Sequence, residues 1–128
     1  MADYTPVYEN GSLPYTLTAS ATVTGGQVVV HTGVGTCGPS AGASGLVLGI
    51  AAHDAATNAR VSVWPIAGLV HETITPVGGV TSGDSLTSGT AGGIIGGNTL
   101  ATVAAAGTLL GTAISTATVG LKARWVGK

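Results

Sequence analysis

The residues best able to do chemistry in this chain are three histidines, one cysteine and five carboxylates. The histidines have no short metal-ligand spacing: His31, His53 and His71. Cys37 has no second cysteine as a partner. The neighbours His53 and Asp54 would supply a base for Ser40 or Cys37, but no nucleophile-elbow motif accompanies them. The sequence therefore predicts no catalytic residues, no metal site and no cofactor, and we expect a protein that is not an enzyme.

The carboxylates are also scattered among predicted turns and strand faces: Asp3, Glu9, Asp54, Glu72 and Asp84. Asp84 and Gln27 each follow a glycine, and we interpret both as residues that bind the amides of a turn. A literal match to the dinucleotide-binding fingerprint lies at residues 33–38 (GVGTCG). That motif works by opening a helix, whereas a proline comes next here, so we interpret the match as chance.

Composition narrows the remaining classes of function. The chain of 128 residues has 22 glycines, is 45% hydrophobic and only 7% charged, whereas an average domain carries about 25% charged residues. A formal net charge of −1 and four dispersed basic residues argue against nucleic-acid binding. The most apolar stretch, residues 92–117, is interrupted by glycines and predicts no membrane span.

An unusually neutral surface favours a protein that is covered by other chains in an assembly. The alternative is a stable monomer coated with Thr, Ser and Ala. A lone Cys37 is compatible with a reducing compartment, and residues 1–12 lack the pattern of a secretory signal.

The elements that would position these residues form an internal repeat. Residues 46–64 predict a strand, a polar turn and a second strand, and residues 108–126 match them without a gap at an offset of 62. Residues 23–29 resemble residues 80–86 at an offset of 57. We place the first copy at about 23–77 and the second at about 80–128, within one domain at 20–128. Two copies favour a compact all-β barrel or sandwich.

The other segments carry weaker signals. Residues 66–77 alternate as a strand, and residues 33–45 and 89–97 are predicted to be glycine-rich loops. Residues 99–106 fit either a strand or a short helix, and their threonines favour the strand. Trp64 and Trp125, near the ends of matching strands, are interpreted as core plugs or intersubunit contacts.

Residues 1–19 differ from the rest and predict an extended N-terminal arm. The segment holds every tyrosine of the chain, two prolines and the turn signal Asn10-Gly11. Such an arm either folds back as an edge strand of its own domain or lies along a neighbouring chain by strand addition. The concentration of aromatic residues favours the neighbour.

The order of these segments resembles a known family. The stretches LGIAAHDAATNARVSVWPIAGLVHE, VTSGDSLTSGTAGG and LLGTAISTATVGLKARWVG, with the arm before them, look like the small capsid decoration (cement) proteins of tailed bacteriophages. The resemblance covers about residues 26–127, and the opening of the chain is also similar.

The resemblance implies a structural virion protein, made in the cytoplasm of the host cell, that binds the outer surface of an assembled capsid and stabilises it. It implies the major capsid protein as partner, a homotrimer, and no nucleic acid or membrane. By region, it assigns capsid binding to apolar residues of the arm: Tyr4, Pro6, Val7, Tyr8, Leu13, Pro14, Tyr15 and Leu17. The alternative function is a carbohydrate- or cell-surface-binding β module of a phage particle, which would need exposed aromatic platforms.

Overall fold

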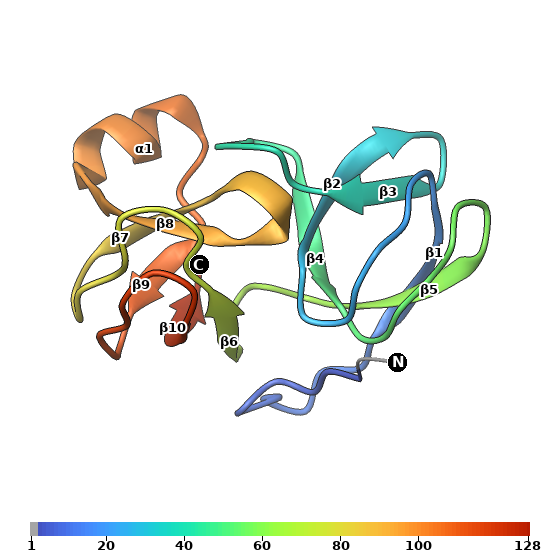
Figure 1. The fold of residues 1–128 in the computed structure, drawn as a ribbon, viewed down its shortest axis with the longest axis horizontal. Coiled ribbons are helices and arrows are strands. Elements are labelled where there is room, and N and C mark those ends of the chain that lie inside the picture. Colours follow the sequence, from blue (N-terminus) through green and yellow to red (C-terminus); the bar gives the residue numbers. More distant parts are fainter. Residues whose placement is uncertain (1–2) are drawn as a thin grey trace.

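The computed structural model describes residues 3–128 and has two β-rich halves that lie side by side (Figure 1). The first half contains β1 (Tyr15–Ala19), β2 (Val28–Gly33), β3 (Thr36–Pro39), β4 (Val47–Ala51) and β5 (Arg60–Trp64). The second half contains β6 (Val70–Ile74), β7 (Ser85–Ser88), the 3₁₀ turn η1 (Thr90–Gly92), β8 (Ile94–Asn98), α1 (Leu100–Ala106), β9 (Gly111–Ala113) and β10 (Lys122–Gly127). The predicted all-β fold with a repeated unit is confirmed.

The two halves differ in closure. In the first half the strands form a closed barrel in the order β1-β3-β2-β4-β5, because β1 pairs antiparallel with β5 and parallel with β3. In the second half the order is β6-β10-β9-β7-β8, and no ladder joins β6 to β8. The second half is therefore an open sheet with two edge strands.

Strand register confirms the internal repeat. The β4–β5 hairpin pairs Ala51 with Val63, and the β9–β10 hairpin pairs Ala113 with Trp125, each residue 62 positions further on. Likewise β2 pairs with β4 as β7 pairs with β9. We call positions related in this way twins. β1 and β6 are also twins at an offset of 56, since both pair with the last strand of their half.

One pair of twin glycines lies where the two strands of each hairpin approach closely. A Cβ added at Gly49 would overlap the Trp64 carbonyl oxygen, and a Cβ at Gly111 would overlap the carbonyl of the twin residue Val126. Only glycine allows the two strands of each hairpin to approach this closely.

Three segments differ from the sequence-based expectation. The glycine-rich stretches 33–45 and 89–97 were expected to be loops, but they contain β3 and most of β8. Residues 70–74 were placed in the first copy, whereas β6 pairs with β10 of the second sheet. Tertiary pairing decides these segments, since strand propensity depends strongly on neighbouring strands.

The expectation of a strand at residues 99–106 is wrong, because Leu100–Ala106 form α1. Four alanines, the best helix formers, outweigh the threonines. Gly107 ends the helix in the left-handed conformation (φ 72°), and its N–H bonds to the Ala104 carbonyl. Among residues 3–128, no helix is both long and apolar enough to cross a membrane.

Two hydrophobic clusters fill the fold. The barrel of the first half encloses mostly small side chains: Ala19, Val23, Val29, Cys37, Ala51, Ala55, Val61 and Val63. The other cluster fills the second half around Trp125 and extends to the outer face of the barrel through Val28, Ile50 and Trp64. The two halves therefore share a packed junction.

Candidate functional site

The structure does not gather the residues that could do chemistry. His31 is exposed on β2, His53 is half-buried beyond β4, and His71 is buried on β6. Within the described residues, no three His, Cys, Asp or Glu side chains come close enough to hold a metal ion. Cys37 lies in the barrel core, where burial raises the pKa of its thiol. Residues 33–38 turn from β2 into β3 and open no helix.

Gln27 and Asp84, interpreted as turn residues, do bind turn amides. The Thr24 N–H donates to Gln27 Oε1 at 2.8 Å, and the Thr81 N–H donates to Asp84 Oδ2 at 2.9 Å. The two turns are twins. Gln27 makes one further bond, from Nε2 to the Ala91 carbonyl at 3.0 Å, which ties the first half to η1.

The start of the arm is held at the junction of the two halves by Tyr4. The Tyr4 N–H donates to the Ala52 carbonyl at 2.7 Å, and the Tyr4 carbonyl accepts the Trp64 indole N–H at 3.2 Å. Its hydroxyl accepts the Glu72 N–H at 3.1 Å and lies 2.8 Å from His71 Nδ1. Tyr4 thus contacts strands from both halves.

The roles of His71 in this network follow from its partners. His71 Nε2 lies 2.8 Å from the Pro65 carbonyl, which only accepts, so Nε2 carries the proton. Nδ1 therefore accepts the Tyr4 hydroxyl proton. The imidazole also lies between the rings of Tyr4 and Trp125, with centroids at 5.9 and 5.1 Å. Burial lowers the pKa of His71 to about 4, and burial also raises the pKa of Tyr4.

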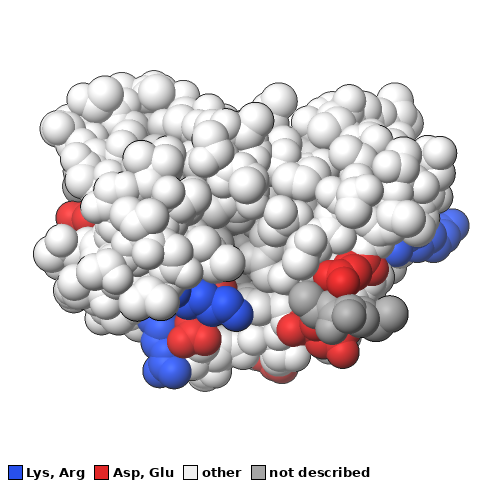
Figure 2. Space-filling model, in the orientation of Figure 1, with Lys and Arg blue, Asp and Glu red and all other residues white. Residues whose placement is uncertain are grey.

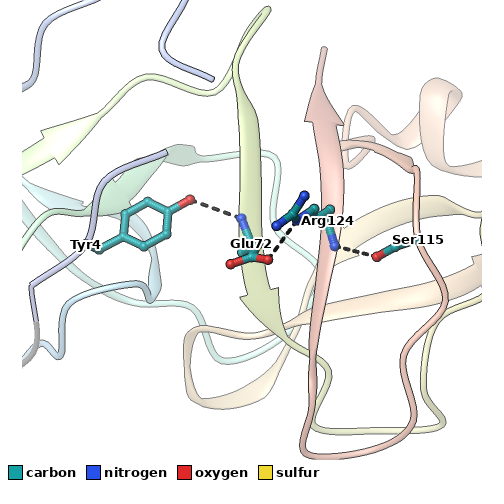
Figure 3. A network of polar contacts seen from close by, with 4 residues as sticks. All are labelled: Tyr4, Glu72, Ser115 and Arg124. Carbon is teal, nitrogen blue, oxygen red and sulfur yellow. Dashed lines mark hydrogen bonds and ion pairs between the residues drawn. The ribbon is translucent and has the colours of Figure 1, made fainter. Parts of the chain in front are cut away.

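The network reaches the surface at an ion pair (Figure 3). Arg124 Nε donates to Glu72 Oε2 at 2.8 Å, and the Arg124 N–H donates to Ser115 Oγ at 2.8 Å. The Arg124 side chain is exposed, so we expect the pair to contribute at most about 1 kcal/mol.

The rest of the arm pairs with β6 and then turns back. Tyr8 and Val70 exchange main-chain hydrogen bonds of 3.1 and 3.3 Å, and the Val7 N–H also donates to the Val70 carbonyl. Asn10 and Gly11 both have positive φ and reverse the chain toward β1. The beginning of the arm therefore folds back on its own chain, and Figure 1 shows it passing beneath both halves.

The apolar residues assigned to the arm divide by exposure. Pro6 is buried, while Tyr4 and Leu17 are half-buried. The remaining five are exposed, and Leu13 is 80% exposed: Val7, Tyr8, Leu13, Pro14 and Tyr15. Tyr15 and Leu17 belong to β1 of the barrel. The sequence showed that these residues form an unusual group, but it held no signal for which of them the fold uses.

Both tryptophans are buried. Trp125 is fully enclosed and donates its indole N–H to Thr73 Oγ1 at 3.0 Å, while Trp64 packs at the junction. Neither ring offers the exposed platform that a glycan-binding site would need.

Charge is distributed unevenly over the surface. Figure 2 shows Lys, Arg, Asp and Glu in the lower part of the view and at its left and right margins at mid-height, while the upper part, over α1, β2 and β3, is uncharged. No charged residue occurs between Glu9 and Asp54 or between Asp84 and Lys122. The uncharged face thus spans both halves.

One hollow lies where the second sheet fails to close. This seam cleft has a volume of about 250 Å³ and is bounded by the turn at residues 24–27, by β6, and by η1 with Gly93. Among the described residues that line it, Glu72 and Lys122 are the charged ones. The sequence carries no signal for this cleft, because the cleft depends on how the two halves meet.

Comparisons with known proteins identify a family and a similar fold. A family model described as phage cement protein matches residues 7–124. A similar solved structure, "The crystal structure of head fiber gp8.5 N base in bacteriophage phi29", has a TM-score of 0.68 and 18% sequence identity, and the match covers 91% of this chain and 93% of that one. At this identity the likeness is one of fold. Among curated proteins, none matches the sequence significantly.

Proposed function

The chain belongs to the phage cement protein family and is a capsid-associated structural protein; from this premise we propose that it binds the outer surface of the assembled capsid and stabilises the shell. The observation that carries the proposal is the family match, which spans nearly the whole chain. A cement protein needs many adhesive contacts and no chemistry, and a largely uncharged surface suits that role.

The exposed residues of the arm are the proposed contacts with the major capsid protein. Leu13 and Tyr8 have 80% and 56% of their surfaces exposed. Tyrosine and leucine at such positions bring a large apolar area to an interface, and the tyrosine hydroxyl stays hydrogen-bonded. Tyr4 and Pro6 are held by the fold, so they would position the arm rather than touch the capsid.

A homotrimer is part of the proposal. Each copy offers a small contact area, and linking three copies on one shell makes the later contacts intramolecular. Avidity of this kind raises attachment by roughly 10²–10⁴ without any deep pocket. An uncharged face that spans both halves is also suited to close packing against neighbouring copies.

Mixing the purified protein with bare capsids tests the proposal. We expect added density at three-fold positions by electron microscopy and a higher temperature for disruption of the shell. The double variant Tyr8→Ser/Leu13→Ser should weaken attachment. The matched control Val119→Ser/Leu121→Ser removes two apolar side chains of comparable exposure just before β10, outside the arm. Equal attachment of both variants would contradict the role of the arm, and a bare shell after mixing would contradict the function itself.

A further inference from the structure

We propose that Tyr4 and His71 form an acid-sensitive latch for the start of the arm, residues 3–8. The latch holds this segment against β6 while the His71 imidazole is neutral, and it opens when the imidazole takes up a further proton. Both halves stay folded in the open state. The inference concerns the chain by itself, so its outcome is independent of the proposed function.

The closed latch is a set of matched hydrogen bonds. Neutral His71 donates from Nε2 to the Pro65 carbonyl at 2.8 Å, so its Nδ1 accepts the proton of the Tyr4 hydroxyl, also at 2.8 Å. The Tyr4 oxygen in turn accepts the Glu72 N–H at 3.1 Å. Every donor in the set meets an acceptor. In the part of the chain that the structure describes, no buried side-chain nitrogen or oxygen lacks a hydrogen-bond partner.

A further proton on His71 breaks this match. Both ring nitrogens are then donors, so the Tyr4 oxygen faces two donors, the His71 Nδ1–H and the Glu72 N–H, while its own proton has lost its acceptor. A buried donor without a partner is unfavourable, and so is a buried charge without a counter-charge. Both conditions end when Tyr4 moves out and water reaches the ring.

No counter-charge lies beside the ring. On the sheet face that carries His71, the adjacent residues of β6 and β10 do not ionise: Thr73, Ala123 and Trp125. Successive side chains of a strand point to opposite faces, so Glu72 lies on the other face, where it pairs with Arg124. Asp3, next to Tyr4 in the arm, is exposed. Tyr4 itself stays neutral, because burial raises its pKa.

The arm, rather than the sheet, is the part that yields. The ladder between β6 and β10 pairs every residue of β6. On the opposite edge of β6, the main-chain bonds of the arm are those of Val7 and Tyr8 with Val70. Pro6 is buried, but residues 7–11 are exposed. Segments with few buried contacts open at a lower free energy than core strands do.

Hydrogen exchange measured by NMR at several pH values tests the latch. After correction for intrinsic exchange rates, the Val7, Tyr8 and Glu72 amides should lose protection between pH 7 and pH 5, while those of β2 to β5 keep theirs. His71 has a pKa of about 4 in the closed state. With an ordinary pKa near 6.5 in the open state, the open population should rise roughly 20-fold. Full protection of the arm at pH 5, or an equal loss in every strand, would overturn the latch.

Two variants separate the members of the latch. His71→Gln keeps a donor for the Pro65 carbonyl and an acceptor for the Tyr4 hydroxyl but does not ionise, so its arm should stay protected at pH 5. Tyr4→Phe removes the hydroxyl and should speed exchange of the arm at pH 7 by roughly tenfold. The matched control is Tyr8→Phe, whose hydroxyl bonds to Asn10 within the arm, and it should behave as the unaltered protein. Equal exchange in Tyr4→Phe and Tyr8→Phe would overturn the latch.

His53 is a second histidine near the arm and needs its own control. Its main chain pairs with Asp3, and its Nε2 accepts the Ser62 N–H at 3.1 Å. We expect His53→Gln to retain the release of the arm at pH 5. Release that persists in His71→Gln, whether or not His53→Gln abolishes it, would overturn the latch.

Discussion

The two halves of the molecule have related strands but different hydrophobic cores. The first half closes its strands into a barrel, and the enclosed space is filled by alanines, valines and one cysteine. The second half stays open, and its core contains Trp125, Leu86, Ile94 and Leu110. A closed barrel of five strands has little interior volume, whereas an open sheet needs larger side chains and a cover. The outer face of the barrel supplies part of that cover.

The two cores differ in side-chain size at twin positions of the matching strands. Val63 of the barrel corresponds to Trp125, and Val61 corresponds to Ala123. A large side chain beside a smaller one keeps the total volume close to what the site allows. The two halves therefore share their strand register and their twin glycines, although the side chains of their cores differ in size.

The largest expected effect is at Trp125. We expect Trp125→Ala to lower the free energy of unfolding by about 3–5 kcal/mol, because it leaves a large cavity. The twin change Val63→Ala removes only two methyl groups, and we expect a loss of about 2 kcal/mol. Urea denaturation followed by circular dichroism measures both values. Equal losses would contradict the distinction between a tightly closed and an open half.

The second prediction concerns pH, because only the second half has a buried histidine in its core. The pKa of His71 is about 4 in the folded protein, below its ordinary value of 6.5, so the folded state favours the neutral imidazole. This contribution is complete above about pH 6.5 and is lost as the pH falls toward 4. The shift corresponds to roughly 3 kcal/mol.

Denaturation at pH 7, 5 and 4 measures this loss, with His71→Gln as the comparison. Gln does not ionise, so the variant should show a flatter pH dependence over this range. A wild-type curve parallel to that of the variant would mean that His71 is not the titrating group.

The smallest effects are expected at the twin turns. Asp84→Ala removes one acceptor from a turn amide, and we expect a loss of about 1 kcal/mol. Gln27→Ala removes the same turn bond and also the bond to η1, so its loss should be larger by up to about 1 kcal/mol. Thermal unfolding of both variants gives the difference. A smaller loss at Gln27 would show that the bond between the halves contributes little.

Local patterns predicted much of the fold. The repeat at residues 46–64 and 108–126 identified both hairpins, and the alternation in residues 69–76 correctly separated the buried Leu69, His71, Thr73 and Thr75 from their neighbours. The glycines of the two stretches concealed β3 and β8, although β8 begins with the β-branched pair Ile94 and Ile95. In both cases the strands are specified by their partners rather than by their own residues.

The sequence by itself determined the class of fold, the duplication and the turn roles of Gln27 and Asp84, because these depend on residue period and on contacts a few positions apart. Only the tertiary structure decided that one half closes and the other stays open. It also decided that Tyr4 binds His71 and Glu72, more than 60 residues away. Those outcomes depend on which strand edges meet and which hydrogen-bonding groups each edge offers: the Ser20 N–H of the barrel bonds to the Cys37 carbonyl, whereas its twin residue Pro76 has no N–H.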